Sequence, residues 1–174
     1  MITVIQAGAS VGTFLVFVIT AFLALRQLTL SNKSNQLAGL QAVSAHFNGA
    51  EFDKWFEFVL TELPKKMKDR SFRESLSAYP VDRDVHLEIR LADWYEETGI
   101  YARYGVISEA PLMEVLRGHP DTAWEALDAT VSLYRASWGP SYFRNFEYLA
   151  KRSRNFYGKL DPKRISRGRA VEAR

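Results

Sequence analysis

The chain has 174 residues, of which 47% are hydrophobic and 13% aromatic, so it is long and apolar enough for one modest domain with a real core. It contains no cysteine, which excludes disulfides, thiolate metal ligands and cysteine nucleophiles. The formal charge is +3, but residues 151–174 carry nine Lys or Arg against two acids, so the preceding 150 residues have a formal charge of −4. A mildly acidic body therefore precedes a basic C-terminal stretch.

Residues 1–27 form the first predicted element, an uncleaved transmembrane anchor. No charged side chain precedes Arg26, and residues 11–25 are almost wholly apolar, which suits the roughly 20 residues that a helix needs to cross a bilayer. A signal peptide would carry Lys or Arg before its apolar run, whereas here Arg26 and Lys33 follow it. The alternative is the buried core helix of a soluble protein. The charge asymmetry predicts that the N-terminus lies outside and the domain in the cytoplasm.

Polar side chains inside the span recur in steps of three and four, so they share one helical stripe. Such a stripe can hydrogen-bond to a second helix within lipid, and Gly8 and Gly12 form a separate small-xxx-small pair on another face. Both features predict self-association of the span. The alternative is that the hydroxyls bond to their own backbone and the helix stands alone. The stripe contains Gln6, Ser10, Thr13 and Thr20, with Thr3 and Gln27 at its two ends.

The rest of the chain predicts an all-α fold, a single N-terminal transmembrane helix followed by a cytoplasmic helical bundle. Residues 28–49 keep a loose helical spacing and form either a helical extension of the anchor or a hinge at the Ser/Asn cluster 31–36. Residues 50–157 predict a bundle of about five to six helices, because apolar residues recur at helical spacing without strand-like alternation. The expected helices cover 51–63, 71–78, 82–104, 108–117, 120–138 and 141–157. Residues 158–174 predict a basic, disordered tail.

Three histidines are the natural candidates for metal or acid–base chemistry: His46, His86 and His119. His86 lies close to Glu88, but no second His stands at the i, i+4 spacing of a helical metal site. The chain also has no Gly-rich phosphate loop, no Gly-x-Ser-x-Gly elbow and no CxxC motif. We therefore predict no metal, no cofactor and no catalytic residue.

Charged residues inside apolar helical stretches form a second group of candidates. An Arg in such a stretch pairs with an acid across the bundle, stacks on an aromatic ring such as Trp138 or Tyr142, or forms an anion or partner site. We favour the structural ion pair, which commonly sets helix register. The members of this group are Arg90, Asp93, Glu97, Arg135, Arg144 and Glu147.

The basic C-terminal stretch predicts contact with anionic lipid, since each basic residue near an anionic membrane contributes about 1 kcal/mol. A merely solvated stretch is the alternative. Charge alone also suits nucleic acid, but no recognition module accompanies it, so we do not expect that partner. The residues are Lys151, Arg152, Arg154, Lys159, Lys163, Arg164, Arg167 and Arg169.

Aromatic packing motifs at residues 95–107, 124–127 and 146–150 resemble those of a family of small bacterial proteins of unknown function, which have one N-terminal span and a helical domain. The resemblance covers most of residues 10–157 and implies a bacterial inner-membrane setting. The family has no assigned catalytic residues, so the resemblance implies no mechanism.

These observations favour a membrane-anchored helical interaction or adaptor module without catalytic activity, which binds a protein partner or another copy of itself as well as the bilayer. The first alternative is a self-associating membrane effector, a toxin or defence component, whose polar stripe lines up on oligomerisation and perturbs the bilayer. The lower alternative is a hydrolase that uses the carboxylates of Glu96 and Glu97, although a solvated helix face is the favoured interpretation of that pair.

Overall fold

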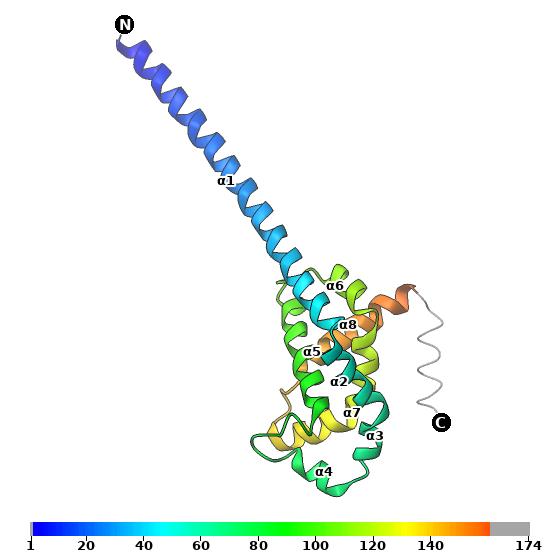
Figure 1. The fold of residues 1–174 in the computed structure, drawn as a ribbon. Helices are drawn as coiled ribbons and strands as arrows, with labels where there is room; N and C mark the ends of the chain where they lie inside the picture. The colour runs from blue at the N-terminus through cyan, green and yellow to red at the C-terminus, as the bar shows by residue number, and fades with distance from the viewer. Residues whose placement is uncertain (1, 161–174) are drawn as a thin grey trace. The chain divides into compact units, whose positions relative to one another are not determined.

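The structure is a computed structural model that describes the backbone of residues 2–160 and the side chains of residues 14–158. Within this range the chain is all-helical, as the sequence predicted, and it divides into two compact units, Met1–Ala38 and Gly39–Arg174. The helices are α1 (Ile2–Phe47), α2 (Ala50–Thr61), α3 (Leu63–Lys66), α4 (Arg70–Ser75), α5 (Leu87–Arg103), α6 (Glu109–Leu116), α7 (His119–Trp138) and α8 (Arg144–Leu160) (Figure 1).

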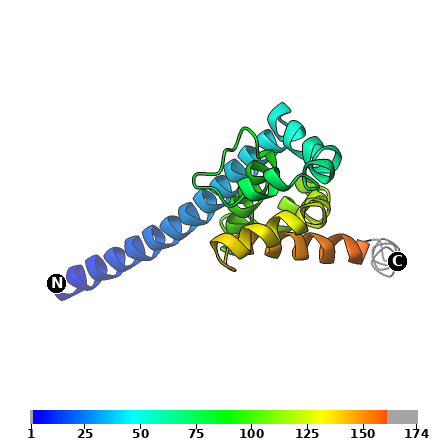
Figure 2. The same cartoon turned by 90° about the horizontal axis from the view of Figure 1, so that it is seen from below.

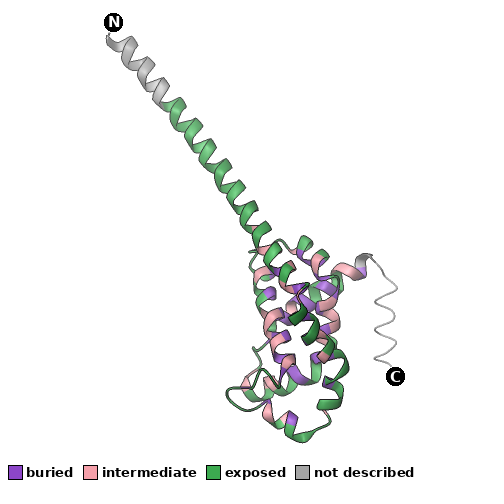
Figure 3. Ribbon diagram, in the orientation of Figure 1, coloured by how far each residue is buried: buried purple, intermediate pink, exposed green. Residues whose placement is uncertain are grey.

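The first unit consists of the N-terminal part of α1. Every residue from Phe14 to Asn35 is exposed, as Figure 3 shows by colour. By length and composition α1 is apolar enough to cross a membrane. It stays helical through residues 31–36. The boundary between the two units falls after Ala38, inside the segment predicted as extension or hinge.

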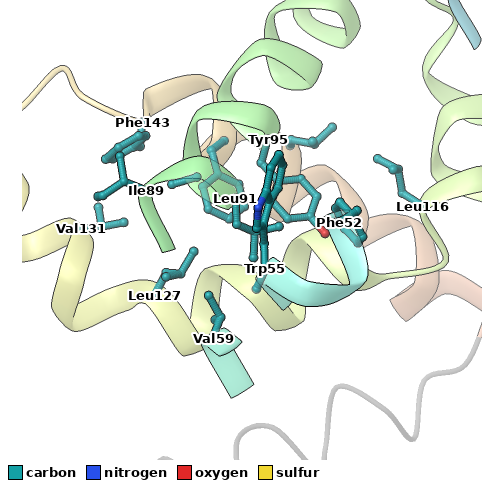
Figure 4. Packing of buried hydrophobic residues seen from close by; sticks show 14 of the residues in the cluster. Phe52, Trp55, Val59, Ile89, Leu91, Tyr95, Leu116, Leu127, Val131 and Phe143 are labelled. Carbon is teal, nitrogen blue, oxygen red and sulfur yellow. The ribbon is translucent and has the colours of Figure 1, made fainter. Parts of the chain in front are cut away.

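The second unit has its core around α5, which packs against α2, α6, α7 and most extensively α8. Tyr95 is the largest fully buried side chain of this core, and its ring stacks on Phe146 of α8 at a centroid distance of 4.8 Å. Phe52 and Trp55 of α2 close the same core from another side (Figure 4). A stacked aromatic pair contributes about 0.5–1.5 kcal/mol beyond the area that it buries. Tyr95 and Phe146, which lie in two of the aromatic motifs that the sequence singled out, are therefore packing residues.

The second most extensive helix–helix contact in this unit is between α7 and α8, which lie side by side (Figure 2). Leu127 and Val131 of α7 and Leu149 of α8 are buried. The opposite face of α8 carries charged side chains, so α8 is amphipathic and covers the core with one face.

Several helix boundaries differ from those predicted, for local reasons. The helix α5 begins at Leu87 and not at residue 82, because the Asp82 carboxylate accepts hydrogen bonds from the backbone N–H groups of Asp84 and Val85 at 2.9 and 3.4 Å. Such a turn offers the backbone an alternative to the helix. The predicted helix 51–63 is replaced by α2 and the short helix α3, and Pro64 lies in the first turn of α3, where proline is tolerated. With the additional short helix α3, the described part of the second unit has seven helices after α1, where five to six were predicted.

Candidate functional site

The most chemically distinctive cluster in the second unit is a buried relay of three polar side chains, Ser75, His86 and Glu88. His86 Nδ1 lies 2.7 Å from Glu88 Oε1, and His86 Nε2 lies 2.7 Å from Ser75 Oγ. The side chains of His86 and Glu88 are 1% and 0% exposed. Ser75 ends α4, and His86 and Glu88 stand at the start of α5, so the relay joins two helices across the intervening loop.

The order of hydroxyl, imidazole and carboxylate is that of a nucleophilic hydrolase. Two features favour a structural role here instead. Ser75 Oγ also lies 2.8 Å from the carbonyl oxygen of Phe72, which competes with His86 for the single hydroxyl proton. Ser75 also stands at the carbonyl end of α4, where the helix dipole is negative and opposes the developing oxyanion of acyl transfer. The relay is thus better suited to hold α4 against α5.

From its sequence position His86 was a candidate for metal or acid–base chemistry, whereas Ser75 was not singled out. The His-x-Glu spacing was a weak signal, and nothing in the sequence shows that α4 folds back onto residue 86. The other two histidines lie elsewhere: the ring of His46 stacks on Trp94 at 5.4 Å, and His119 Nδ1 is 3.0 Å from the carbonyl oxygen of Leu116. Among the described residues no group of three or more His, Asp or Glu side chains is arranged to hold a metal ion.

Glu96 of α5 caps the N-terminus of α8. Its carboxylate accepts hydrogen bonds from the backbone N–H groups of Asn145 and Phe146, each at 2.8 Å, and from the Asn145 side-chain amide at 2.7 Å. The close approach depends on Gly99, because a Cβ at that position would lie 2.2 Å from the Asn145 carbonyl oxygen. Glu97 is exposed and accepts a hydrogen bond from the Tyr101 hydroxyl. The two adjacent carboxylates therefore serve different partners.

Arg90 and Asp93, expected together in one ion-pair site, have separate partners. Arg90 donates to Asp84 Oδ1 at 2.6 Å and to the Arg83 carbonyl oxygen at 2.8 Å. Asp93 instead accepts two hydrogen bonds from the Arg83 guanidinium, the shorter at 2.9 Å. Both pairs tie the start of α5 to the loop before it. Arg144 is exposed at the first residue of α8.

Arg135 and Glu147, two members of the charged group that the sequence singled out, form an ion pair between α7 and α8. Arg135 Nη2 lies 2.8 Å from Glu147 Oε2, and its guanidinium stands 5.5 Å from the centroid of the Trp124 ring. Glu147 also accepts a hydrogen bond from Lys151, one turn further along α8. The hydrogen bonds from Lys151 and Arg135 lower the pKa of Glu147 below its ordinary value. The pair therefore stays charged at neutral pH and joins the two helices.

The first three basic residues of the predicted membrane-surface set belong to α8. Lys151 pairs with Glu147 of the same helix, and the other two pair with acids on neighbouring helices, so they connect α8 to α6 and α7. These pairs are Arg152 with Glu109 and Arg154 with Asp121 and Glu125. The remaining residues of that set lie outside the residues whose side chains are described, namely Lys159, Lys163, Arg164, Arg167 and Arg169.

The polar stripe of the span lies mostly outside the described side chains. Thr20 and Gln27 are exposed, like every other residue from 14 to 35. The predicted self-association residues whose side chains fall outside the described range are Gln6, Gly8, Ser10, Gly12 and Thr13. Self-association of the span therefore stays a prediction.

In comparisons with known proteins, no protein-family model, no curated protein and no solved structure matches this chain. The resemblance to a bacterial family therefore stays a prediction.

Replacing Glu96 with Gln removes the negative charge from the N-terminus of α8. We expect Glu96→Gln to lower the free energy of unfolding by about 1–2 kcal/mol, the usual cost of a lost helix cap and dipole interaction. Chemical denaturation of the full-length protein in detergent, followed by circular dichroism, measures this change. Glu97→Gln is the matched control and should have almost no effect, because that carboxylate is exposed. Equal losses in the two variants would contradict the capping role.

A structural role for the relay predicts that a fluorophosphonate probe does not label Ser75. It also predicts that His86→Ala lowers the free energy of unfolding by about 3 kcal/mol, because Glu88 then remains buried without its partner. Ser132→Ala, at an exposed position of α7, is the control for the stability measurement. Mass spectrometry of the probe-treated protein locates any adduct. Labelling of Ser75 that His86→Ala abolishes would instead establish a nucleophilic site.

Proposed function

We propose that this protein is a membrane-anchored helical interaction module, an adaptor without catalytic activity. The observation that carries the proposal is the contrast between the two units: residues 14–35 are exposed throughout, whereas the second unit has its own buried core. Apolar surface left in water costs about 25 cal/mol per Å², and the hydrocarbon of a bilayer removes that cost. The span localises the protein, and the helical unit supplies the binding surface.

The proposed orientation places the N-terminus outside and the helical unit in the cytoplasm, at the inner membrane of a bacterial cell. Arg26 and Lys33 support it, because short flanks rich in Lys or Arg stay on the cytoplasmic side. The family resemblance supports the bacterial setting.

A cluster of aromatic rings on the second unit supports a protein partner: Tyr79 and Tyr142 are exposed, and Tyr134 and Trp138 are partly buried. Tyr79 is 87% exposed, and its ring lies 5.6 Å from that of Trp138. The Trp138 indole N–H donates to the Leu76 carbonyl oxygen at 3.3 Å, which holds that ring in place, and Tyr142 lies beside Tyr134 at 5.3 Å. Tyr and Trp are enriched at the centres of protein interfaces, because they offer a large apolar area with a polar end. A partner protein or a second copy of the chain would cover this aromatic cluster.

The anchor is tested by alkaline carbonate extraction of membranes from expressing cells. We expect the full-length protein to stay in the membrane pellet and the double variant Phe17→Arg/Phe22→Arg to leave it, since each Arg inside a span costs about 2.5–3.5 kcal/mol on insertion scales. The matched control is Leu60→Arg, an exposed position of α2, which should remain in the pellet. Recovery of the unchanged protein in the supernatant would overturn the anchor.

The interaction surface is tested by placing a photo-crosslinking benzophenone amino acid at Tyr79 of the full-length protein. Irradiation of native membranes should give an adduct of one defined mass, because the side chain would lie against the partner. The control position is Asp128, which is exposed on α7 outside the aromatic cluster. An adduct of the same mass at both positions, or none at Tyr79, would contradict this surface.

A further inference from the structure

The turn between α5 and α6 presents apolar side chains to the outside on a well-supported backbone. Tyr104 is 66% exposed and Val106 is 55% exposed. The turn is not loose: the Gly105 N–H donates to the Ala102 carbonyl oxygen, and the Ile107 N–H donates to the Tyr101 carbonyl oxygen, both at 3.2 Å. We call residues 104–106 the apolar turn.

Glycine is required at the tip of the apolar turn, where Gly105 has a φ of 69°. Ile107, directly after the turn, is only 2% exposed, so it fixes the turn to the core of the second unit. Tyr104 and Val106 are thus held outward by a folded scaffold. Apolar side chains displayed in this way commonly mark a contact with a partner or a membrane.

The covalent link between the span and this turn is short. Ile107 packs on α1 within the second unit, since a Cβ added at Gly39 would lie 3.1 Å from its Cγ1 atom. The exposed run begins at Phe14, and its last large apolar residue is Leu30. Gly39 lies only nine residues after Leu30. Nine residues extend about 14 Å as a helix and about 32 Å when fully stretched. If the span is inserted, the apolar turn therefore lies within reach of the membrane surface.

The chemistry of the turn suits that surface. Tyrosine is enriched at the level of the lipid headgroups, where its ring is partly buried and its hydroxyl stays hydrated. Arg103, directly before the turn, is exposed and donates a hydrogen bond to Asn145 Oδ1 at 3.1 Å, and Arg26 and Lys33 follow the span in the sequence. An aromatic ring, an aliphatic residue and nearby basic side chains are the usual components of an interfacial membrane contact.

We propose that the apolar turn inserts into the headgroup region of the bilayer that holds the span, as a second membrane contact of the helical unit. This inference rests on the proposed anchoring. The contact gives the unit a defined face toward the lipid and leaves the aromatic cluster at Tyr79 for a protein partner.

The chain has no cysteine, so single cysteines can be introduced and labelled with an environment-sensitive nitrobenzoxadiazole dye. The full-length protein is reconstituted into phosphatidylcholine vesicles containing a minority of phosphatidylglycerol, with spin-labelled lipids as quenchers. The reporters are Val106→Cys and Tyr104→Cys, both at exposed positions. Leu23→Cys reports on the span, and Tyr79→Cys is the matched control in an exposed turn of the second unit.

We expect quenching at Val106→Cys and Tyr104→Cys to be several-fold stronger than at Tyr79→Cys, with Leu23→Cys quenched as well. Quenching at Leu23→Cys together with values at both turn positions no higher than at Tyr79→Cys would overturn the second contact and leave the anchor intact. Absence of quenching at Leu23→Cys would overturn the anchor itself. Energy transfer between turn labels on separate copies, without lipid quenching, would assign the turn to a second copy and also overturn the proposal. Circular dichroism of each variant confirms its helical content.

Discussion

The carboxylate of Glu96 at the N-terminus of α8 is the interaction on which the arrangement of the second unit most depends. The first N–H groups of a helix lack partners within it, and here two of them bond to a carboxylate supplied by α5. The N-terminus of α8 is therefore held against α5, and the absence of a side chain at Gly99 allows the backbone at Asn145 to come this close. Once α8 begins there, Phe146 stacks on Tyr95 and Glu147 meets Arg135 of α7. One charged group thus organises three helices.

The polar side chains best suited to chemistry mostly connect helices. The relay of Ser75, His86 and Glu88 joins α4 to α5, while the ion pairs of α8 join it to α6 and α7. Helices as short as α4, with six residues, are unstable alone, and a buried hydrogen-bonded contact to a longer neighbour compensates for this. The position of Ser75 at the carbonyl end of α4 agrees with this role, because that end of a helix disfavours the negative charge that develops next to a nucleophilic serine.

In the proposed function, the first unit lies in lipid and the second unit lies in water. The exposed apolar helix suits lipid, and the cored unit suits water with two exposed apolar features, the apolar turn and the aromatic cluster. The two features belong to different segments of the chain. The apolar turn is proposed to contact the bilayer, which leaves the aromatic cluster for a protein partner. A partner could then bind without competing with the membrane, which is what an adaptor needs.

The sequence by itself determined the features that depend on local periodicity and composition: the all-helical class, the apolar N-terminal helix, and most of the helix positions after it. It failed where a local competitor acted, as at Asp82, whose side chain replaces a turn of helix, and at the short helix α3 around Pro64, which was not predicted. Only the tertiary structure decided that Glu96 caps α8 while Glu97 faces outward, and that Ser75 meets His86. Periodicity assigns a side chain to a helix face, but its partner depends on which distant helix packs there. Partners separated by 49 residues, such as Glu96 and Asn145, meet only through the packing of the whole core.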